Sequence, residues 1–282
     1  LNNYANVMCS LRRNAEAQPL LDKSLLEHRT LLGDDDPDTL VVQNNVAVNL
    51  QYLGRINDAL PLLRDGVDKC RRRFGVDHYF ALNAQINYAA ILLQFGRYSE
   101  AEPLYRDAYE RRRKTLGRDH PATLTAANGL AIALNNLGRN DEAAALLKEA
   151  LETRRRVLGA DHPDTIRSMT NYADTLWNLR RFDEAEPLYR QSIELGKKTR
   201  GASHPDVLTS VRNYAKMLFA YGRVDEAEAL AGDALRTARQ TLGADHPLTI
   251  TLQEVVAQIL HKQGKSPATQ TTQPASVPAK SE

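Results

Sequence analysis

Five histidines recur once every 42 residues, and among the side chains of this sequence they are the best candidates for a metal or acid–base centre. They are His78, His120, His162, His204 and His246. Imidazole nitrogens bind Zn²⁺ at about 2 Å, and neutral imidazole can also act as a general base. However, a fixed period of this size is typical of a repeat array, in which equivalent residues lie in successive layers about 10 Å apart. We therefore expect these histidines to belong to the connections between helices, and we predict no metal and no cofactor.

The sequence carries no other catalytic signature. It has no phosphate-binding loop, no nucleophile elbow and no paired cysteine motif. Its two cysteines, Cys9 and Cys70, occupy different repeat positions, which is typical of reduced thiols in packed helices and not of a disulfide framework. We predict that the chain is not an enzyme and that it is cytoplasmic.

A row of asparagines is the better candidate for a binding site. Asn45, Asn87, Asn171 and Asn213 share one repeat position. An amide both donates and accepts hydrogen bonds, so a row of amides can bind the main chain of an extended peptide without selecting its side chains. The same row could instead form a ladder of hydrogen bonds between helices that fixes how the repeats stack. Both interpretations stay open.

Charged and aromatic side chains accompany the amides toward the C-terminus. Arg167, Arg212 and Lys216 fall on the same predicted helix faces as Asn171 and Asn213. Because charge-assisted hydrogen bonds are the stronger kind, we predict that this region binds an acidic or carboxylate-bearing segment.

Trp177 is the chain's one tryptophan and falls on the same predicted face. It is either an aromatic shelf for a ligand side chain or part of the packing between repeats.

Charge and hydropathy exclude two classes of partner. Lys and Arg total 37 and Asp and Glu total 35, for a net charge of +2, and the two signs are interleaved. No basic surface therefore suits a phosphate backbone, and no apolar run approaches the roughly 20 residues that cross a bilayer. We expect a protein or peptide partner, and neither nucleic acid nor a membrane.

Two kinds of helix must position these residues. In the unit over residues 121–158, Pro121 suits a first helical position, with His120 or Asp119 as its cap, and Gly138 suits the end of that helix. A second helix follows and ends at Gly159. We predict that it begins at an N-cap whose equivalents through the chain are Asn57, Ser99, Asp141, Asp183 and Asp225. Three of these caps have Glu three residues later, which predicts capping boxes with Glu102, Glu186 and Glu228.

The second helix of each unit ends in basic residues. The clusters lie at 71–73, 111–113, 154–156 and 197–200. Cations there complement the negative end of the helix, so we expect solvated helix ends and not a binding patch.

We predict an all-α chain made of one repeat domain and a tail. The domain covers residues 1–263, with helix pairs near 1–33, 37–75, 79–117, 121–159, 163–201 and 205–243 and a capping helix over 247–263. Residues 264–282 are rich in Ser, Thr, Pro and Gln and are expected to be disordered.

The helix pairs resemble tetratricopeptide repeats. Alanines early in the second helix and small residues later in it match that pattern, as do Asn44-Asn45-Val46-Ala47 and Asn171-Tyr172-Ala173 in the first helix. The usual repeat has 34 residues, and the longer period here is similar to the kinesin light chain variety with its Gly-x-Asp-His-Pro connector. The resemblance implies a right-handed α-solenoid whose first helices line a concave groove.

Four residues depart from the repeat pattern. Asp36 replaces the connector histidine and Tyr79 replaces the connector proline. Gly129 takes the asparagine position, and Arg180 stands where a turn glycine is expected.

Three functions are compatible with this pattern. The first is a non-catalytic scaffold that binds an extended or acidic peptide in the groove. The second is the regulatory repeat region of a larger bacterial signalling enzyme, a kinase or NTPase, whose catalytic domain lies outside this chain, because Leu1 falls in the middle of a repeat. The third is self-association through the truncated N-terminal repeat, whose apolar end we expect to be exposed.

Overall fold

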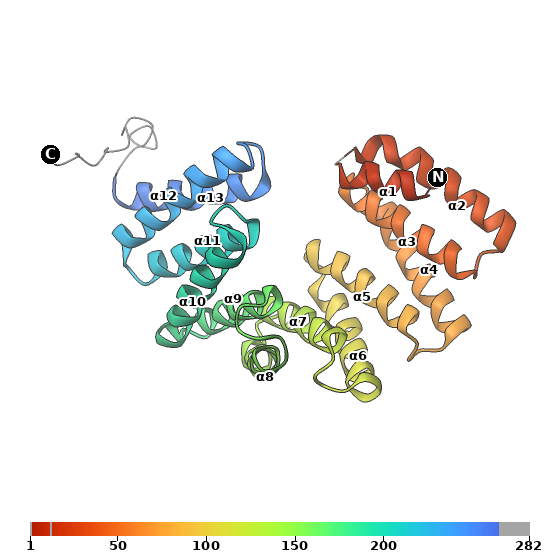
Figure 1. Cartoon of the computed structure of the whole chain (residues 1–282), viewed down its shortest axis with the longest axis horizontal. Helices are drawn as coiled ribbons and strands as arrows, with labels where there is room; N and C mark the ends of the chain where they lie inside the picture. The colour runs from red at the N-terminus through yellow and green to blue at the C-terminus, as the bar shows by residue number, and fades with distance from the viewer. Residues whose placement is uncertain (1, 12, 265–282) are drawn as a thin grey trace. The chain divides into compact units, whose positions relative to one another are not determined.

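The structure, a computed structural model, describes residues 2–11 and 13–264, and within these ranges it contains thirteen α-helices and no strand (Figure 1). The helices are α1 (Asn2–Ser10), α2 (Asn14–Leu32), α3 (Pro37–Tyr52), α4 (Ile56–Phe74), α5 (Tyr79–Gln94), α6 (Tyr98–Leu116), α7 (Pro121–Asn136), α8 (Asn140–Leu158), α9 (Pro163–Asn178), α10 (Phe182–Arg200), α11 (Pro205–Ala220), α12 (Val224–Thr241) and α13 (Pro247–Lys262). The prediction of an all-α chain is confirmed. The predicted disordered tail lies outside the described residues, apart from Gly264.

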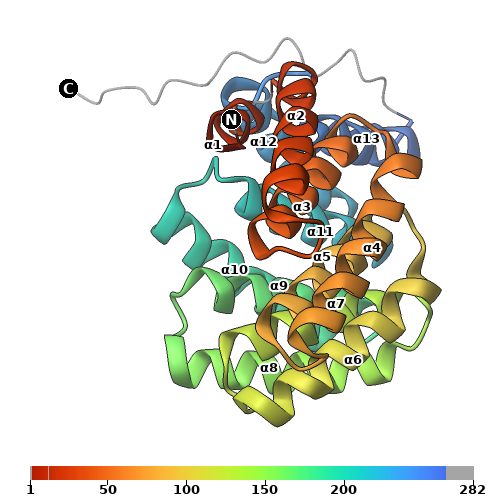
Figure 2. The same ribbon diagram turned by 90° about the vertical axis from the view of Figure 1, so that its right-hand side faces the viewer.

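The helices group into two compact units, residues 1–153 and 154–282. We call the odd-numbered helices A helices and the even-numbered ones B helices. In each unit helices pack on their neighbours along the chain, as α3 packs on α4 in unit 1 and α11 on α12 in unit 2. Successive A helices also touch, as α5 touches α7 and α9 touches α11 (Figure 2). Each unit is therefore a stack of helical hairpins, which is the solenoid arrangement expected from the sequence.

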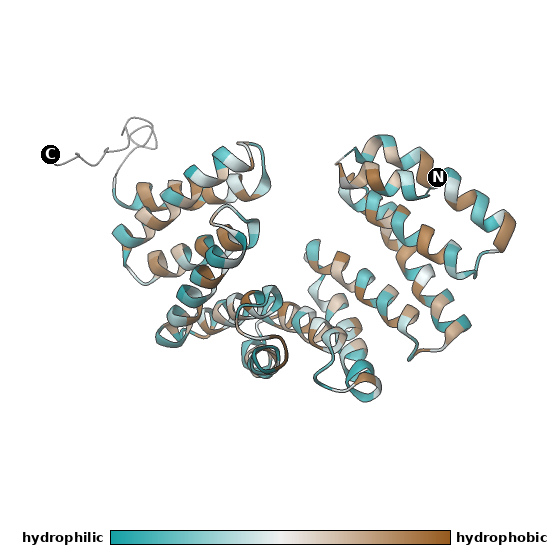
Figure 3. Cartoon of the chain, in the orientation of Figure 1, coloured by the Kyte–Doolittle hydropathy of each residue, from teal (hydrophilic) through white to brown (hydrophobic). Residues whose placement is uncertain are grey.

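Small residues allow the hairpins to pack closely. Apolar and polar residues alternate along the helices (Figure 3), so each helix buries one side against its neighbours. The alanines early in the B helices are fully buried: Ala59, Ala101, Ala143, Ala185 and Ala227. No helix in residues 2–11 or 13–264 is long and apolar enough to cross a bilayer.

The A helices begin as the sequence predicts, with a side-chain cap. The residue before α3 is Asp36, and the five recurring histidines precede α5, α7, α9, α11 and α13. Each accepts a hydrogen bond from the backbone N–H two residues later, at 2.9 to 3.2 Å, through an Asp oxygen or the imidazole Nδ1. The histidines thus satisfy backbone donors that the first turn of a helix leaves unpaired.

The B helices begin differently from the prediction. The N-cap residue of α2, α4, α6, α10 and α12 is an arginine, for example Arg55 before α4 and Arg97 before α6, and it makes no side-chain cap bond. The five predicted caps therefore lie inside the first turn, and the prediction is wrong. A guanidinium has no acceptor, so it cannot cap an N–H. Instead it pairs with an acidic residue three positions on, at 2.8 Å for Arg55–Asp58 and 2.6 Å for Arg97–Glu100.

Two of the glutamates predicted for capping boxes, Glu102 and Glu186, bind arginine side chains. Glu186 on α10 accepts hydrogen bonds from Arg190 of its own helix, from Tyr214 of α11 and from Arg223 before α12. Burial alone would raise the pKa of Glu186, but these three donors lower it to about 2. Glu186 therefore joins three successive elements of unit 2.

The structure explains two of the departures from the repeat pattern. A Cβ on Gly129 would lie 2.1 Å from the ring of the buried Tyr105, so the ring occupies the space that an asparagine side chain would need. Arg180 takes the left-handed φ of 61° that glycines take in the equivalent turns. The turn is thus conserved at a non-glycine residue, at a cost of about 1 kcal/mol.

Candidate functional site

Amides of neighbouring A helices are paired in unit 1. Asn45 on α3 donates to the Oδ1 of Asn2 on α1 at 3.2 Å, and Asn87 on α5 donates to the Oδ1 of Asn44 on α3 at 3.1 Å. Asn45 is half-buried and Asn87 is exposed. Two of the predicted binding residues thus take part in hydrogen bonds that join successive repeats, while staying accessible on one side.

Unit 2 continues this pattern with a charged network. Asn213 on α11 donates to both carboxylate oxygens of Asp174 on α9, at 3.1 and 3.0 Å, and the hydroxyl of Tyr189 on α10 also donates to Asp174. Arg212 donates from Nε and Nη2 to the Oδ1 of Asn213, and from Nη1 to the Oγ1 of Thr251 on α13. The Asn213 amide therefore lies between the guanidinium and the carboxylate, and we call these five residues the Asp174 network.

Burial shifts the titration of this network. It raises the pKa of Asp174 to about 6, although the donors Tyr189 and Asn213 and the positive charges of Arg212 and Lys216 act in the opposite direction. Burial beside the Asp174 charge also raises the pKa of the Tyr189 hydroxyl. Burial lowers the pKa of Arg212. The Arg212 guanidinium and the Asp174 carboxylate are thus both half-screened from water and are joined through the Asn213 amide.

Aromatic rings and lysines extend the same A helices. The Nζ of Lys216 on α11 lies 5.9 Å from the ring centre of Trp177 on α9, and the Nζ of Lys262 on α13 lies 5.0 Å from that of Phe219 on α11. Both rings are half-buried and pack on the core of unit 2, while both lysines are exposed. The rings thus serve inter-repeat packing and also hold the ammonium groups at the surface.

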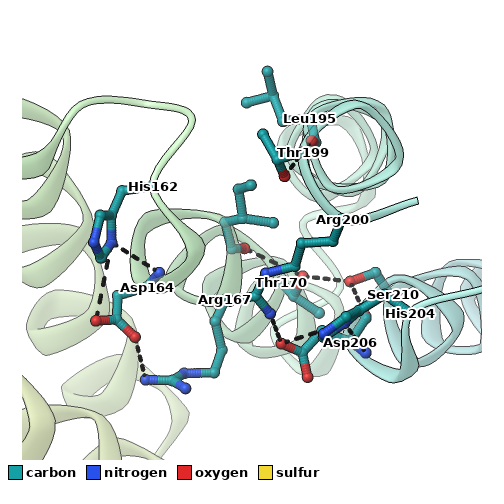
Figure 4. Close-up of polar contacts among 11 residues, drawn as sticks. His162, Asp164, Arg167, Thr170, Leu195, Thr199, Arg200, His204, Asp206 and Ser210 are labelled. Carbon is teal, nitrogen blue, oxygen red and sulfur yellow. Dashed lines mark hydrogen bonds and ion pairs between the residues drawn. The ribbon is translucent and has the colours of Figure 1, made fainter. Parts of the chain in front are cut away.

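Two further predicted residues, Arg167 and Asn171, lie on α9. Arg167 pairs with Asp164 one turn earlier on α9, at 2.7 Å, beside the His162 cap (Figure 4). Asn171 is half-buried on the same helix. Figure 4 also shows Thr170 of α9 bonded to Ser210 of α11, at 2.8 Å, which ties these A helices together.

The sequence analysis missed two buried arginines. Arg112 and Arg154 stand in clusters expected to be solvated, yet only 3% and 2% of their surface is exposed. Arg112 donates to the carbonyl of Ala122 and to Asn83, and Arg154 donates to Ser168. The exposed arginines Arg113 and Arg155 have the same 42-residue spacing, so the sequence offered no signal that singles out Arg112 and Arg154. Both side chains cross from a B helix to the start of an A helix.

The groups on the A-helix faces determine which contacts this region can make. Among the described residues, no three His, Cys, Asp or Glu side chains are placed to hold a metal ion. The histidine Nδ1 atoms already accept backbone hydrogen bonds. The A-helix faces offer paired amides, a guanidinium with donors left over, and lysines above rings, which together can hydrogen-bond a main chain and bind an anionic group.

The comparisons with known proteins agree with the architecture. The tetratricopeptide repeat profile matches residues 1–72, 80–155, 124–198, 168–239 and 206–268. Comparison with curated protein sequences yielded no significant match.

Several solved structures are similar to this chain. A kinesin light chain protein of Podosopora anserina with nearly identical TPR-like repeats is 26% identical, over 73% of this chain and 98% of that one, with a TM-score of 0.62. A signal transduction ATPase with numerous domains and a tetratricopeptide repeat sensor, from Pyrococcus horikoshii, is 14% identical over 94% of this chain and 39% of that one, with a TM-score of 0.64.

NprR in complex with its cognate peptide NprX is 14% identical to this chain, over 93% of this chain and 72% of that one, with a TM-score of 0.64. The last two likenesses show the fold alone. The expected similarity to kinesin light chain repeats is confirmed by the first. Because the repeat profile covers most of the sequence, the protein belongs to the tetratricopeptide repeat family.

Proposed function

We propose that this protein is a non-catalytic scaffold that binds an extended peptide segment of a partner protein along its A helices. The observation that carries the proposal is the row of asparagines at one repeat position, of which Asn45, Asn87 and Asn213 each donate to a side chain on the preceding A helix. A paired amide keeps donor or acceptor capacity on its open side, so a peptide main chain can add hydrogen bonds or replace the existing ones. NprR, whose fold is similar, is in complex with a peptide, which supports the compatibility of such a fold with peptide binding.

Within unit 2, the A-helix face suits an acidic peptide segment. Arg212 has N–H groups beyond the three bonds that it makes to Asn213 and Thr251, and exposed Lys216 adds a second cation beside Trp177. Asn171 and Arg167 extend the region toward the start of α9. Charge-assisted bonds to a carboxylate are the strongest contacts that this surface can make.

The test begins with peptides selected from a random display library by the wild-type protein. Their affinities are then measured by fluorescence anisotropy for Lys216→Glu and Arg212→Ala. We expect binding to weaken at least about tenfold in each variant, since a lost charged contact is worth roughly that much.

The matched controls are Lys198→Glu on α10 and Arg236→Ala on α12, because both side chains are exposed and lie on B helices. The proposal is contradicted if the library yields no binder. It is also contradicted if the controls lose as much affinity as the test variants. If Arg212→Ala lowers only the melting temperature and leaves affinity intact, the network is a stacking ladder and not a binding site.

A second candidate function is the regulatory repeat region of a larger signalling enzyme. It is favoured by the Pyrococcus horikoshii ATPase. In that protein the tetratricopeptide repeats are described as a sensor and form one part of a longer chain. Sequencing the gene on both sides of this segment tests it. A kinase or phosphate-loop motif in the same reading frame supports this candidate, and stop codons that bound the repeats exclude it.

A further inference from the structure

The connection between α4 and α5 carries a cluster of aromatic rings that no other connection in the described part of the chain has. The ring centres of Phe74 and His78 are 5.0 Å apart, Phe80 lies 5.5 Å from His78, and Tyr79 lies 5.9 Å from Phe80. Tyr79 is 62% exposed and Phe80 is 40% exposed. Rings that are stacked on one another in advance lose little freedom when a partner covers them.

This connection is also basic. Arg72 and Arg73 are exposed in the last turn of α4, and the guanidinium of Arg73 lies 5.7 Å from the Phe74 ring centre. The carboxylate of Asp77 is already paired with Arg111 of α6 at 2.8 Å. Neither Arg72 nor Arg73 has an ion pair among the residues that the structure describes. We call residues 72–80 the basic aromatic loop.

The preceding connection, between α2 and α3, has the complementary chemistry. Leu31 and Leu32 are 80% and 51% exposed, and four aspartates follow them. Asp34 pairs with Arg29, and Asp36 caps α3. The remaining two, Asp35 and Asp38, are exposed and have no ion pair within the described ranges. We call residues 31–38 the acidic leucine loop.

Both loops lie on the same edge of unit 1 (Figure 1). Lys69 of α4 approaches Asp34 of the acidic leucine loop at 3.9 Å, and Leu40 of α3 packs in one small core with Ala81 of α5 and the partly buried Phe74. A two-fold rotation can bring this edge of one copy against the same edge of a second copy. The acidic leucine loop of each copy then faces the basic aromatic loop of the other. Such an isologous contact forms two identical interfaces at once.

We propose that two copies of this chain associate through this edge, with the acidic leucine loop of each copy lying on the basic aromatic loop of the other. The leucines cover the exposed faces of Tyr79 and Phe80, and the outward aspartates face Arg72 and Arg73. The two loops include the first residues of α3 and α5 but none of the residues proposed to bind the peptide.

The main test measures the dimer by sedimentation velocity over a wide concentration range. Arg72→Glu/Arg73→Glu and Asp35→Lys/Asp38→Lys each place like charges opposite one another in both interfaces. We expect the dimer dissociation constant of each variant alone to rise about 100-fold, because each of the two identical interfaces is weakened about tenfold. An equimolar mixture of the two variants restores the dimer, because one interface is then wild-type and the other has its charges exchanged.

A second variant removes the rings without removing the fold. Tyr79→Pro/Phe80→Ala gives this connection the sequence His-Pro-Ala that the chain itself has at residues 120–122. Proline suits the first position of α5, and the backbone N–H of residue 80 still donates to the His78 cap. We expect unchanged circular dichroism and melting, together with a weakened dimer.

The matched charge control is Lys197→Glu/Lys198→Glu, which makes the same charge change in the last turn of α10 and leaves the dimer intact. A wild-type chain that stays monomeric at the highest concentration overturns the proposal, even if the edge then binds an unrelated acidic peptide. So does a dimer that survives both charge variants, or a mixture that fails to restore it.

Discussion

At the scale of single residues, Asp174 makes the stability of unit 2 depend on pH in the direction opposite to most carboxylates. Its pKa in the folded chain is raised to about 6, above the value of 3.8 for an unperturbed aspartate. The folded state therefore binds this proton more tightly than the unfolded state does. The stabilising contribution is fully present below pH 3.8 and is lost as the pH rises through 6.

We predict that Asp174→Asn removes this dependence. The variant keeps an oxygen that can accept from Tyr189 or Asn213, but it cannot ionise. Thermal unfolding followed by tryptophan fluorescence, at pH 5 and pH 7.5, should show the wild-type protein losing more stability than the variant as the pH rises. Equal losses in the two proteins would mean that Asp174 titrates at an ordinary pKa, and Asp233→Asn on the exposed surface of α12 is the control.

Gly129 gives a second prediction at the residue scale. Gly→Ala within a helix usually stabilises by up to about 1 kcal/mol, because alanine has the higher helix propensity. At Gly129 the new Cβ would lie 2.1 Å from the Tyr105 ring, whereas at Gly66 it would lie 3.4 Å from the flexible Gln43 amide. We therefore expect Gly129→Ala to destabilise by about 1 to 3 kcal/mol in urea unfolding, and Gly66→Ala to be neutral or stabilising. The same sign for both substitutions would contradict the packing.

At the scale of elements, the histidine caps of the A helices should contribute more to stability than the arginine–acid pairs at the start of the B helices. The backbone N–H of Ala122 donates to the Nδ1 of His120 at 3.1 Å, so His120→Ala leaves that donor without its cap. We expect a loss of about 1 kcal/mol in urea unfolding, and little or none for His120→Asn, since asparagine is a good cap. Arg97→Ala removes only an exposed ion pair and should cost less than His120→Ala. A larger effect of Arg97→Ala would reverse this order.

The same comparison explains which elements could be predicted from sequence. His-Pro fixes the start of an A helix locally, because proline sets φ at the first position and the residue before it stays extended and can cap. The B helices carry Asn, Ser or Asp two residues after an arginine. Because these residues are common N-caps, they predicted a helix start two residues too late. The Arg-x-x-Asp/Glu spacing was the better signal, since an acidic group in the first turn complements the positive helix end.

At the scale of the whole molecule, the period predicted which residues share a face but not which of them touch. Asn171 and Asn213 were correctly expected on A helices. The bonds from Tyr189 and Asn213 to Asp174, however, join side chains from three helices. They depend on how far each hairpin is displaced along the next. Likewise, Arg112 cannot be told from the neighbouring arginines by residue type. It is buried because its side of α6 faces the next repeat.

The stacking of hairpins leads to a final prediction about cooperativity. In a repeat array each hairpin is stabilised by its neighbours, so damage at one end should weaken that end first. Leu252 on α13 is fully buried against the end of unit 2, and Trp177, the one tryptophan of the chain, reports on the same unit. We expect Leu252→Ala to cost about 3 kcal/mol locally. In urea, the tryptophan fluorescence transition should then precede the main loss of helical circular dichroism.

The control is Gln258→Ala, an exposed position on the same helix, which should leave the two signals as they are in the wild-type protein. If the fluorescence and circular dichroism transitions of Leu252→Ala shift together by the same amount, the chain unfolds as one cooperative block. The description of unit 2 as weakened first would then fail for this protein, because a cavity in α13 would be felt equally by the helices of unit 1.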